Sequence, residues 1–178
     1  MTSSLMMPSV AGVGGMPRTN ISLSAARAVS DATGSAPAVN QIELHPYLQQ
    51  SALVEACGHL GIAVTAYSPL GSPDSAAFLG RKDDVLLTQH PTITAIAEAR
   101  SATPGQVLIA WALARGTSVI PKSVNRGRIA ENWGARDLAL TLADMTAIAA
   151  LEEGLISPDE RPVNCVGYYT LGERRFGC

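Results

Sequence analysis

Short apolar segments and longer segments with helical spacing alternate along this chain. Residues 38–44 and 62–67 are short, rich in β-branched residues and preceded by Pro37 and Gly61, which is typical of β-strands. Residues 117–121 have the same character. The segment 62–67 is largely apolar, as a strand covered on both faces should be. The pattern therefore predicts three strands.

Between and around these strands, apolar residues recur with the spacing of amphipathic helices. A serine at position 22 or 24 could cap the first helix, and Gly34 can end it in a left-handed turn. Thr103, followed three residues later by Gln106, is a start signal for another helix. The predicted helices cover residues 22–33, 50–60, 92–101, 104–115, 127–135 and 142–152.

Strands that alternate with helices indicate an α/β fold with a parallel sheet. A closed βα barrel needs eight strands and about 250 residues, whereas three strands are predicted here in 178 residues. The predicted α/β architecture over residues 20–157 is therefore incomplete. An irregular segment at residues 1–19 would precede it, and a tail at residues 158–178 would follow. Since the open edges of such a sheet need cover, self-association through them is an expected possibility.

Composition narrows the class of protein. The chain is 47% hydrophobic and 16% charged, with a formal net charge of −2, which is a globular composition. A pI near 5.9 argues against a nucleic acid partner. No apolar run approaches the roughly 20 residues that a membrane span requires. Three widely spaced cysteines match no metal-ligand pattern, so we expect reduced thiols in a cytoplasmic protein; they are Cys57, Cys165 and Cys178.

Polar residues gather where each predicted strand ends, which is where parallel βα folds build their sites. After the third strand, Lys122 and Arg128 supply a point charge and a planar fork that suit a phosphate, and Ser123 adds a hydroxyl. The ring of Tyr67 beside the amide of Gln41 suits a flat, partly polar ligand ring. In the alternative interpretation, the amide satisfies backbone groups, the tyrosine is core and the two cations form a solvated face.

Three segments carry these residues: AVNQIELHPYLQQ (38–50), TAYSPLGS (65–72) and VIPKSVNRGRIAENW (119–133). In this order and at these separations they resemble the C-terminal half of the aldo-keto reductase family, over about residues 19–155. The family fold is a (β/α)8 barrel that binds NADP(H) over its C-terminal face. The resemblance therefore implies a partial (β/α)8 TIM barrel, with parallel strands alternating with helices, over residues 20–157 of this chain. The resemblance implies NADPH-dependent reduction of aldehydes and ketones to alcohols, or the reverse reaction, on a small-molecule carbonyl or alcohol substrate.

The resemblance also implies a role for individual residues. Asn20 and Gln41 would bond the nicotinamide carboxamide, and Tyr67 would stack on the nicotinamide ring, although residues 18 and 19 depart from the family's pattern. Loop contacts to the pyrophosphate, and the fastening of that loop, would fall to Ser68, Leu70, Ser72 and Asp74. Contacts to the adenosine 2′-phosphate and the adenine would fall to Lys122, Ser123, Arg128, Glu131 and Asn132.

The family's catalytic residues lie on the barrel half that this resemblance does not cover. Members use an Asp–Tyr–Lys–His tetrad, because the carbonyl oxygen gains negative charge as hydride arrives and must receive a proton. The sequence holds two lysines, Lys82 and Lys122, and the second belongs to the phosphate motif. We therefore expect no catalytic residue, no metal and little or no turnover. The chain would be a truncated gene product or a half-barrel that binds nucleotide or a partner.

Overall fold

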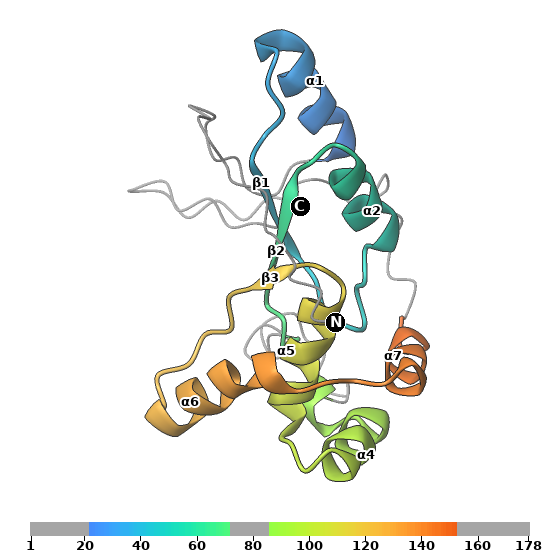
Figure 1. Ribbon diagram of the computed structural model, residues 1–178, viewed down its shortest axis with the longest axis vertical. Helices are drawn as coiled ribbons and strands as arrows, with labels where there is room; N and C mark the ends of the chain where they lie inside the picture. The colour runs from blue at the N-terminus through green and yellow to red at the C-terminus, as the bar shows by residue number, and fades with distance from the viewer. Residues whose placement is uncertain (1–21, 72–85, 153–178) are drawn as a thin grey trace, which may run out of the picture.

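The computed structural model describes residues 22–71 and 86–152 and is built on a three-stranded parallel sheet of order β1-β2-β3 (Figure 1). The strands are β1 (Val39–Glu43), β2 (Ala63–Tyr67) and β3 (Ser118–Val119). β1 and β2 pair along their whole length, with Val39 opposite Ala63 and Glu43 opposite Tyr67. β3 pairs through two residues only, opposite Thr65 and Ala66.

Helices occupy every connection, as the predicted alternation requires. α1 (Leu23–Thr33) precedes β1, and α2 (Ser51–His59) joins β1 to β2. The connection from β2 to β3 includes the 3₁₀ turn η1 (Leu87–Gln89), α4 (Pro91–Ala99) and α5 (Pro104–Ala114). The elements after β3 are α6 (Arg126–Gly134), the 3₁₀ turn η2 (Ala135–Asp137) and α7 (Leu142–Ala149). The prediction of an α/β partial barrel is confirmed.

The helix signals in the sequence work as expected at two helices. The Ser22 hydroxyl caps α1 by accepting the Ala25 N–H, and Gly34 ends the helix with a φ of 70°. At α5, the Thr103 hydroxyl accepts the Gln106 N–H while the Gln106 side chain accepts the Thr103 N–H, forming a capping box. These contacts satisfy N–H groups that have no partner within the helix.

The core lies between one face of the sheet and α5. Ile42, Val64 and Ala66 point toward the helices and are buried in one cluster with Trp111, which is 1% exposed. All six residues from Val107 to Ala112 are buried, so α5 is enclosed around its circumference. Cys57, on α2, belongs to the same cluster.

Several element ends differ from the expectation. β3 covers two residues rather than five, because only β2 offers it backbone partners among the described residues. α4 begins at Pro91 rather than Thr92, since the His90 ring accepts the Thr92 N–H in place of a hydroxyl or carboxylate cap. α7 ends at Ala149, before the expected position 152. The expected segments 1–19 and 158–178, with Cys165 and Cys178, lie outside the described residues.

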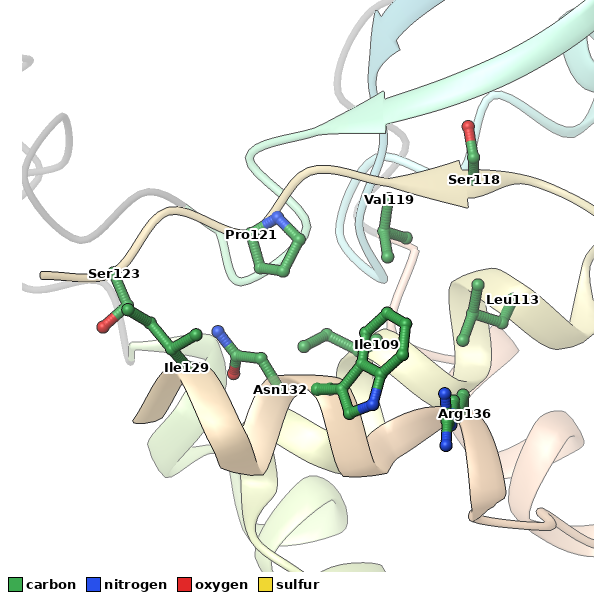
Figure 2. A pocket seen from close by; sticks show the side chains of 10 residues that line it. Ile109, Leu113, Ser118, Val119, Pro121, Ser123, Ile129, Asn132 and Arg136 are labelled. Atoms are coloured by element: carbon green, nitrogen blue, oxygen red, sulfur yellow. The ribbon is translucent and has the colours of Figure 1, made fainter. Parts of the chain in front are cut away.

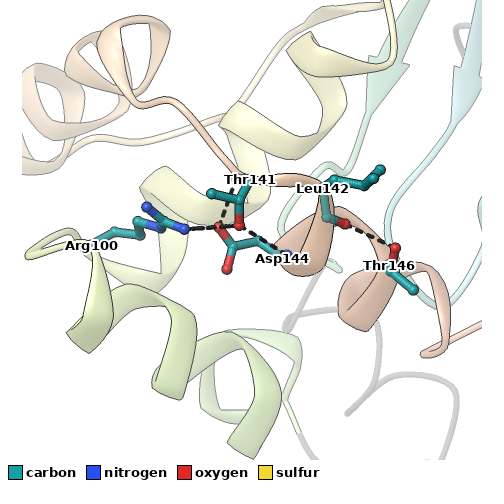
Figure 3. A network of polar contacts seen from close by, with 5 residues as sticks. All are labelled: Arg100, Thr141, Leu142, Asp144 and Thr146. Carbon is teal, nitrogen blue, oxygen red and sulfur yellow. Dashed lines mark hydrogen bonds and ion pairs between the residues drawn. The ribbon is translucent and has the colours of Figure 1, made fainter.

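A polar network joins the end of α4 to the start of α7 (Figure 3). The Arg100 guanidinium donates to the Asp144 carboxylate at 2.6 Å and to the Thr141 hydroxyl at 2.9 Å. Burial of the Asp144 carboxyl raises its pKa, but hydrogen bonds from Thr141 and Arg100 and the charge of Arg100 outweigh this effect. The pKa of Asp144 therefore lies below its ordinary value. Among the described residues, no helix combines the length and apolar character needed to span a membrane.

Candidate functional site

The two faces of the sheet differ in chemistry. In a parallel pair, residues in register project to the same side, so Gln41, Thr65 and Ser118 share a face, and so do Glu43 and Tyr67. These side chains lie opposite the buried set that packs on the helices. The Thr65 and Ser118 hydroxyls are hydrogen-bonded at 2.7 Å. Gln41 and Tyr67 are both half-buried on this polar face, one strand apart.

The chain turns sharply after β2. The Gly71 N–H donates to the Ser68 carbonyl at 2.9 Å, and Ser68 has a φ of 50°. Gly71 has a φ of 80°, and a side chain there would come within 3.1 Å of the Leu87 Cβ atom. Leu70 packs against the core from this turn. Ser68 and Leu70 are thus held at the end of β2. Three of the expected nucleotide contacts lie outside the described residues, namely Asn20, Ser72 and Asp74.

The segment after β3 leads directly into α6. The Asn125 side chain caps this helix by accepting the Arg128 N–H at 3.1 Å. The Ser123 hydroxyl in turn accepts the Asn125 N–H at 3.1 Å. Lys122 and Arg128 are exposed on either side of this cap. Lys122 and Ser123 thus directly precede the start of α6 and Arg128 lies in its first turn, where backbone N–H groups lack intrahelical partners.

The later turns of α6 hold the remaining expected contacts. Glu131 is exposed and Asn132 is half-buried. None of the nine residues of α6, all of which lie in a described range, is buried. The Gln106 side chain connects this helix to α5, since its Nε2 donates to the Glu131 carbonyl at 3.1 Å.

An open pocket of about 440 Å³ lies between β3, α5 and α6 (Figure 2). It is mainly apolar, and it shares only two residues, Ser123 and Asn132, with the expected adenosine contacts. Trp133 at its border is 67% exposed, with the Arg136 guanidinium 4.3 Å from the ring centroid. The pocket is lined by Ile109, Leu113, Ser118, Val119, Pro121, Ser123, Ile129, Asn132, Trp133 and Arg136.

Parallel pairing places the ends of all three strands at one edge of the sheet. Among the expected residues, Gln41 lies in the middle of β1, and Tyr67, Ser68 and Leu70 lie at the end of β2 and in the turn that follows it. Another group, from residue 122 to residue 132, leaves β3 and continues along α6. In the described part, no group of three metal-ligating side chains converges.

Two residues of this region were not singled out for the site from the sequence. Arg126 begins α6 between Lys122 and Arg128 and adds a third cation, which the charge pattern alone could have indicated. The sequence pattern predicts Gln106 only as a capping residue of α5. Its contact with Glu131, 25 positions away, has no signal in the sequence.

Parallel strands joined by helical crossovers are the arrangement expected for part of a (β/α)8 barrel. Solved structures match the chain over most of its length. Gox0644 in its apo form matches with a TM-score of 0.68 at 38% identity, over 80% of this chain and 49% of that one. A Gox0644 variant solved in complex with NADPH gives a TM-score of 0.68 at 37% identity, over 80% and 50%.

The sequence comparisons give the family. The profile of the Aldo/keto reductase family matches residues 16–153. An aldo-keto reductase of Mycobacterium sp. (strain KMS) is 44% identical over 142 residues, which are 79% of this chain and 47% of the relative. Aldo/keto reductase slr0942 of Synechocystis sp. is 47% identical over 134 residues, which are 75% and 41%. The chain belongs to the aldo/keto reductase family, and it spans about half the length of these curated relatives.

Proposed function

We propose that this chain forms the C-terminal, cofactor-binding half of an aldo-keto reductase barrel and binds NADP(H) at the carboxyl edge of its sheet. The arrangement of Lys122, Ser123 and Arg128 around the capped start of α6 carries the proposal. A 2′-phosphate has close to two negative charges, and two cations, a hydroxyl and helix N–H groups are what such a group binds.

The described residues fit the cofactor at its other end as well. Gln41 offers an amide donor and acceptor, and Tyr67 offers a ring, on one face of the sheet. Both are half-buried, which leaves them accessible to a ligand. Glu131 and Asn132 would face the adenine from α6. Asn20, Ser72 and Asp74 remain sequence-based members of the proposed site.

When bound, the dinucleotide supplies a hydride to a carbonyl carbon. This chain's residues would bind and orient it, but the carbonyl oxygen also needs a proton donor in the transition state. Apart from Lys122, already assigned to the phosphate, the sequence has only Lys82 to pair with a tyrosine. We propose that the 178-residue chain binds NADP(H) with little or no turnover by itself. Appreciable NADPH oxidation with a simple aldehyde would contradict this.

The cofactor assignment is tested by the double variant Lys122→Ala/Arg128→Ala. Two charge-assisted contacts of about 1.5 kcal/mol each correspond to an affinity loss of about 100-fold for NADP(H). NAD(H) has no 2′-phosphate, so its affinity should change little. Titration calorimetry with both cofactors gives the comparison, and Arg27→Ala on α1 is a control for loss of one surface charge. Equal losses for both cofactors would refute the 2′-phosphate assignment.

A second candidate is a half-barrel that docks a partner, and the open pocket beside β3 favours it. Ile129 is 51% exposed and Trp133 is 67% exposed, and β3 has no second neighbour strand among the described residues. Such an edge is ready to pair with another strand. This candidate predicts an oligomer that survives dilution in sedimentation and that Ile129→Asp dissociates. A folded monomer at all concentrations would exclude self-assembly.

The intact mass of the protein isolated from its source would separate the candidates further. A mass well above 18.5 kDa, with additional peptides upstream of Asn20, would assign this sequence to a longer reductase in which the tetrad should be sought. A mass of 18.5 kDa would favour cofactor binding or partner assembly by the half-barrel itself.

A further inference from the structure

The first turn of α5 lies directly against the last turns of α6. The Gln106 side chain bridges the two helices, since its Oε1 accepts the Thr103 N–H at 2.9 Å and its Nε2 donates to the Glu131 carbonyl at 3.1 Å. At the same place, two glycines, one on each helix, lie close to a side chain of the other helix. A Cβ atom added at Gly134 would lie 3.2 Å from the Gln106 Nε2, and one added at Gly105 would lie 3.9 Å from the Asn132 Oδ1.

The two helices joined by this bridge are anchored very differently. α5 has six consecutive buried residues, whereas α6 has none. A hydrogen bond from the fixed helix to a backbone carbonyl of the loosely packed one limits how far that helix can slide or rotate. The bonded carbonyl belongs to Glu131, and the neighbouring residue is Asn132, which are two of the proposed adenosine contacts.

We infer that Gln106 is a positioning residue for nucleotide binding. Its amide uses one end to cap α5 and the other to hold α6 in the orientation in which Glu131 and Asn132 meet the adenosine. This inference rests on the proposed cofactor site and adds to it a residue that does not touch the ligand. The same contact makes Gly134 a constrained position, because a side chain there would displace the amide.

Gln106→Glu separates the two uses of this side chain. A carboxylate still accepts the Thr103 N–H, as in a capping box with glutamate, but it cannot donate to the Glu131 carbonyl. We expect affinity for adenosine 2′,5′-bisphosphate, a probe of the adenosine end alone, to fall about fivefold, which corresponds to one neutral hydrogen bond. The thermal midpoint should change little, because the cap and the core are retained.

A spectroscopic readout distinguishes positioning from general destabilisation. The chain has two tryptophans, Trp111 on α5 and Trp133 on α6. In Gln106→Glu, the indole N–H signal of Trp133 should shift or broaden while that of Trp111 stays in place. Gly134→Ala should give the same pattern from the α6 side. Thr141→Ala, which removes the cap of α7, should lower stability without affecting the probe's affinity or the Trp133 signal.

The outcomes separate this inference from the proposed function. If the unaltered chain binds the probe but Gln106→Glu binds it equally well with an unchanged Trp133 signal, Gln106 has no positioning role. If the unaltered chain fails to bind the probe, the proposed cofactor site is wrong. In that case the Trp133 signal still reports the coupling between helices, and an unchanged signal in both variants would overturn that coupling as well.

Discussion

α5 and α6 are neighbouring helices of similar length that are stabilised in different ways. α5 is enclosed by the sheet and the surrounding helices, and its Trp111 side chain is almost fully buried. α6 has no buried residue and exposes Ile129 and Trp133, and its ends are fixed by the Asn125 cap and the Gln106 bridge. Of these two helices, α5 contributes the buried apolar residues, while α6 presents the polar side chains of the proposed cofactor site. Substitutions should therefore separate stability from binding.

The largest expected effect is on the core. Trp111→Ala removes a 1%-exposed ring and should lower the free energy of unfolding by about 3–5 kcal/mol, from lost transfer energy and the cavity left behind. Urea denaturation followed by circular dichroism measures this change. A loss of less than about 1 kcal/mol would mean that burial of the Trp111 ring contributes little to stability.

Asp144→Asn tests how much a polar contact that involves neither α5 nor α6 contributes to the free energy of unfolding. Losing the charged partner of Arg100 should reduce the free energy of unfolding by about 1–2 kcal/mol at neutral pH. The pKa of Asp144 is lowered in the folded state, so its contribution is present above the ordinary value of 3.8 and is lost as pH falls through the folded pKa. The unaltered chain should therefore lose stability in that acidic range by more than the variant does.

The control for this substitution is Asp137→Asn, which removes a second aspartate paired with an arginine. Asp137 is 75% exposed and lies 3.4 Å from the Arg136 Nε. Its removal should have almost no effect on stability, because exposed ion pairs contribute little. Equal acid sensitivity of the two variants would show that the Arg100 network adds nothing specific.

Asn125→Ala removes the cap of α6. Loss of an N-cap costs about 1 kcal/mol, which should accelerate amide hydrogen exchange in the first turn of α6 about fivefold. The urea midpoint of the whole domain should not move, because α6 can fray without exposing the core. Ser22→Ala is the matched variant at α1 and should leave exchange in α6 unchanged. A shift of the global midpoint would show that α6 unfolds together with α5.

The smallest effect is expected for Trp133→Ala. The ring is 67% exposed, and its contact with Arg136 is at the surface, so the free energy of unfolding should change by no more than about 0.5 kcal/mol. The same urea titration of Trp111→Ala and Trp133→Ala compares the loss of a tryptophan from α5 with the loss of one from α6. Similar losses for both would contradict the difference in anchoring between α5 and α6.

The sequence predicted the elements better than their ends. The capping box at Thr103 is local, so residue types a few positions apart were enough to place it. The cap of α1 was narrowed to Ser22 or Ser24, and the structure selects Ser22. The short β3 could not be predicted, because its length depends on backbone partners in β2. His90 was not expected as a cap, since an imidazole is an uncommon acceptor in that position.

The candidate site shows the same limit. The residue types after β3 were sufficient to suggest a phosphate ligand, and in the structure Lys122 and Ser123 directly precede α6 while Arg128 lies in its first turn. The sequence could not show that Gln41 and Tyr67 share a face, because this depends on the register of β1 with β2. The bridge from Gln106 to Glu131 depends on how two helices pack, and no local pattern encodes that. The assigned ligand contacts themselves remain predictions.

Parallel pairing also indicates where this protein can be modified far from the proposed cofactor site. The turns that lead into the strands lie at the opposite edge of the sheet from the proposed cofactor site, at a distance of about 13 Å for a five-residue strand. Gly34 is exposed at one of these turns, and nothing lies within 4 Å of the position that a Cβ atom would take there. A peptide tag inserted after Gly34 would allow the chain to be attached to a surface with the carboxyl ends of the strands facing solution.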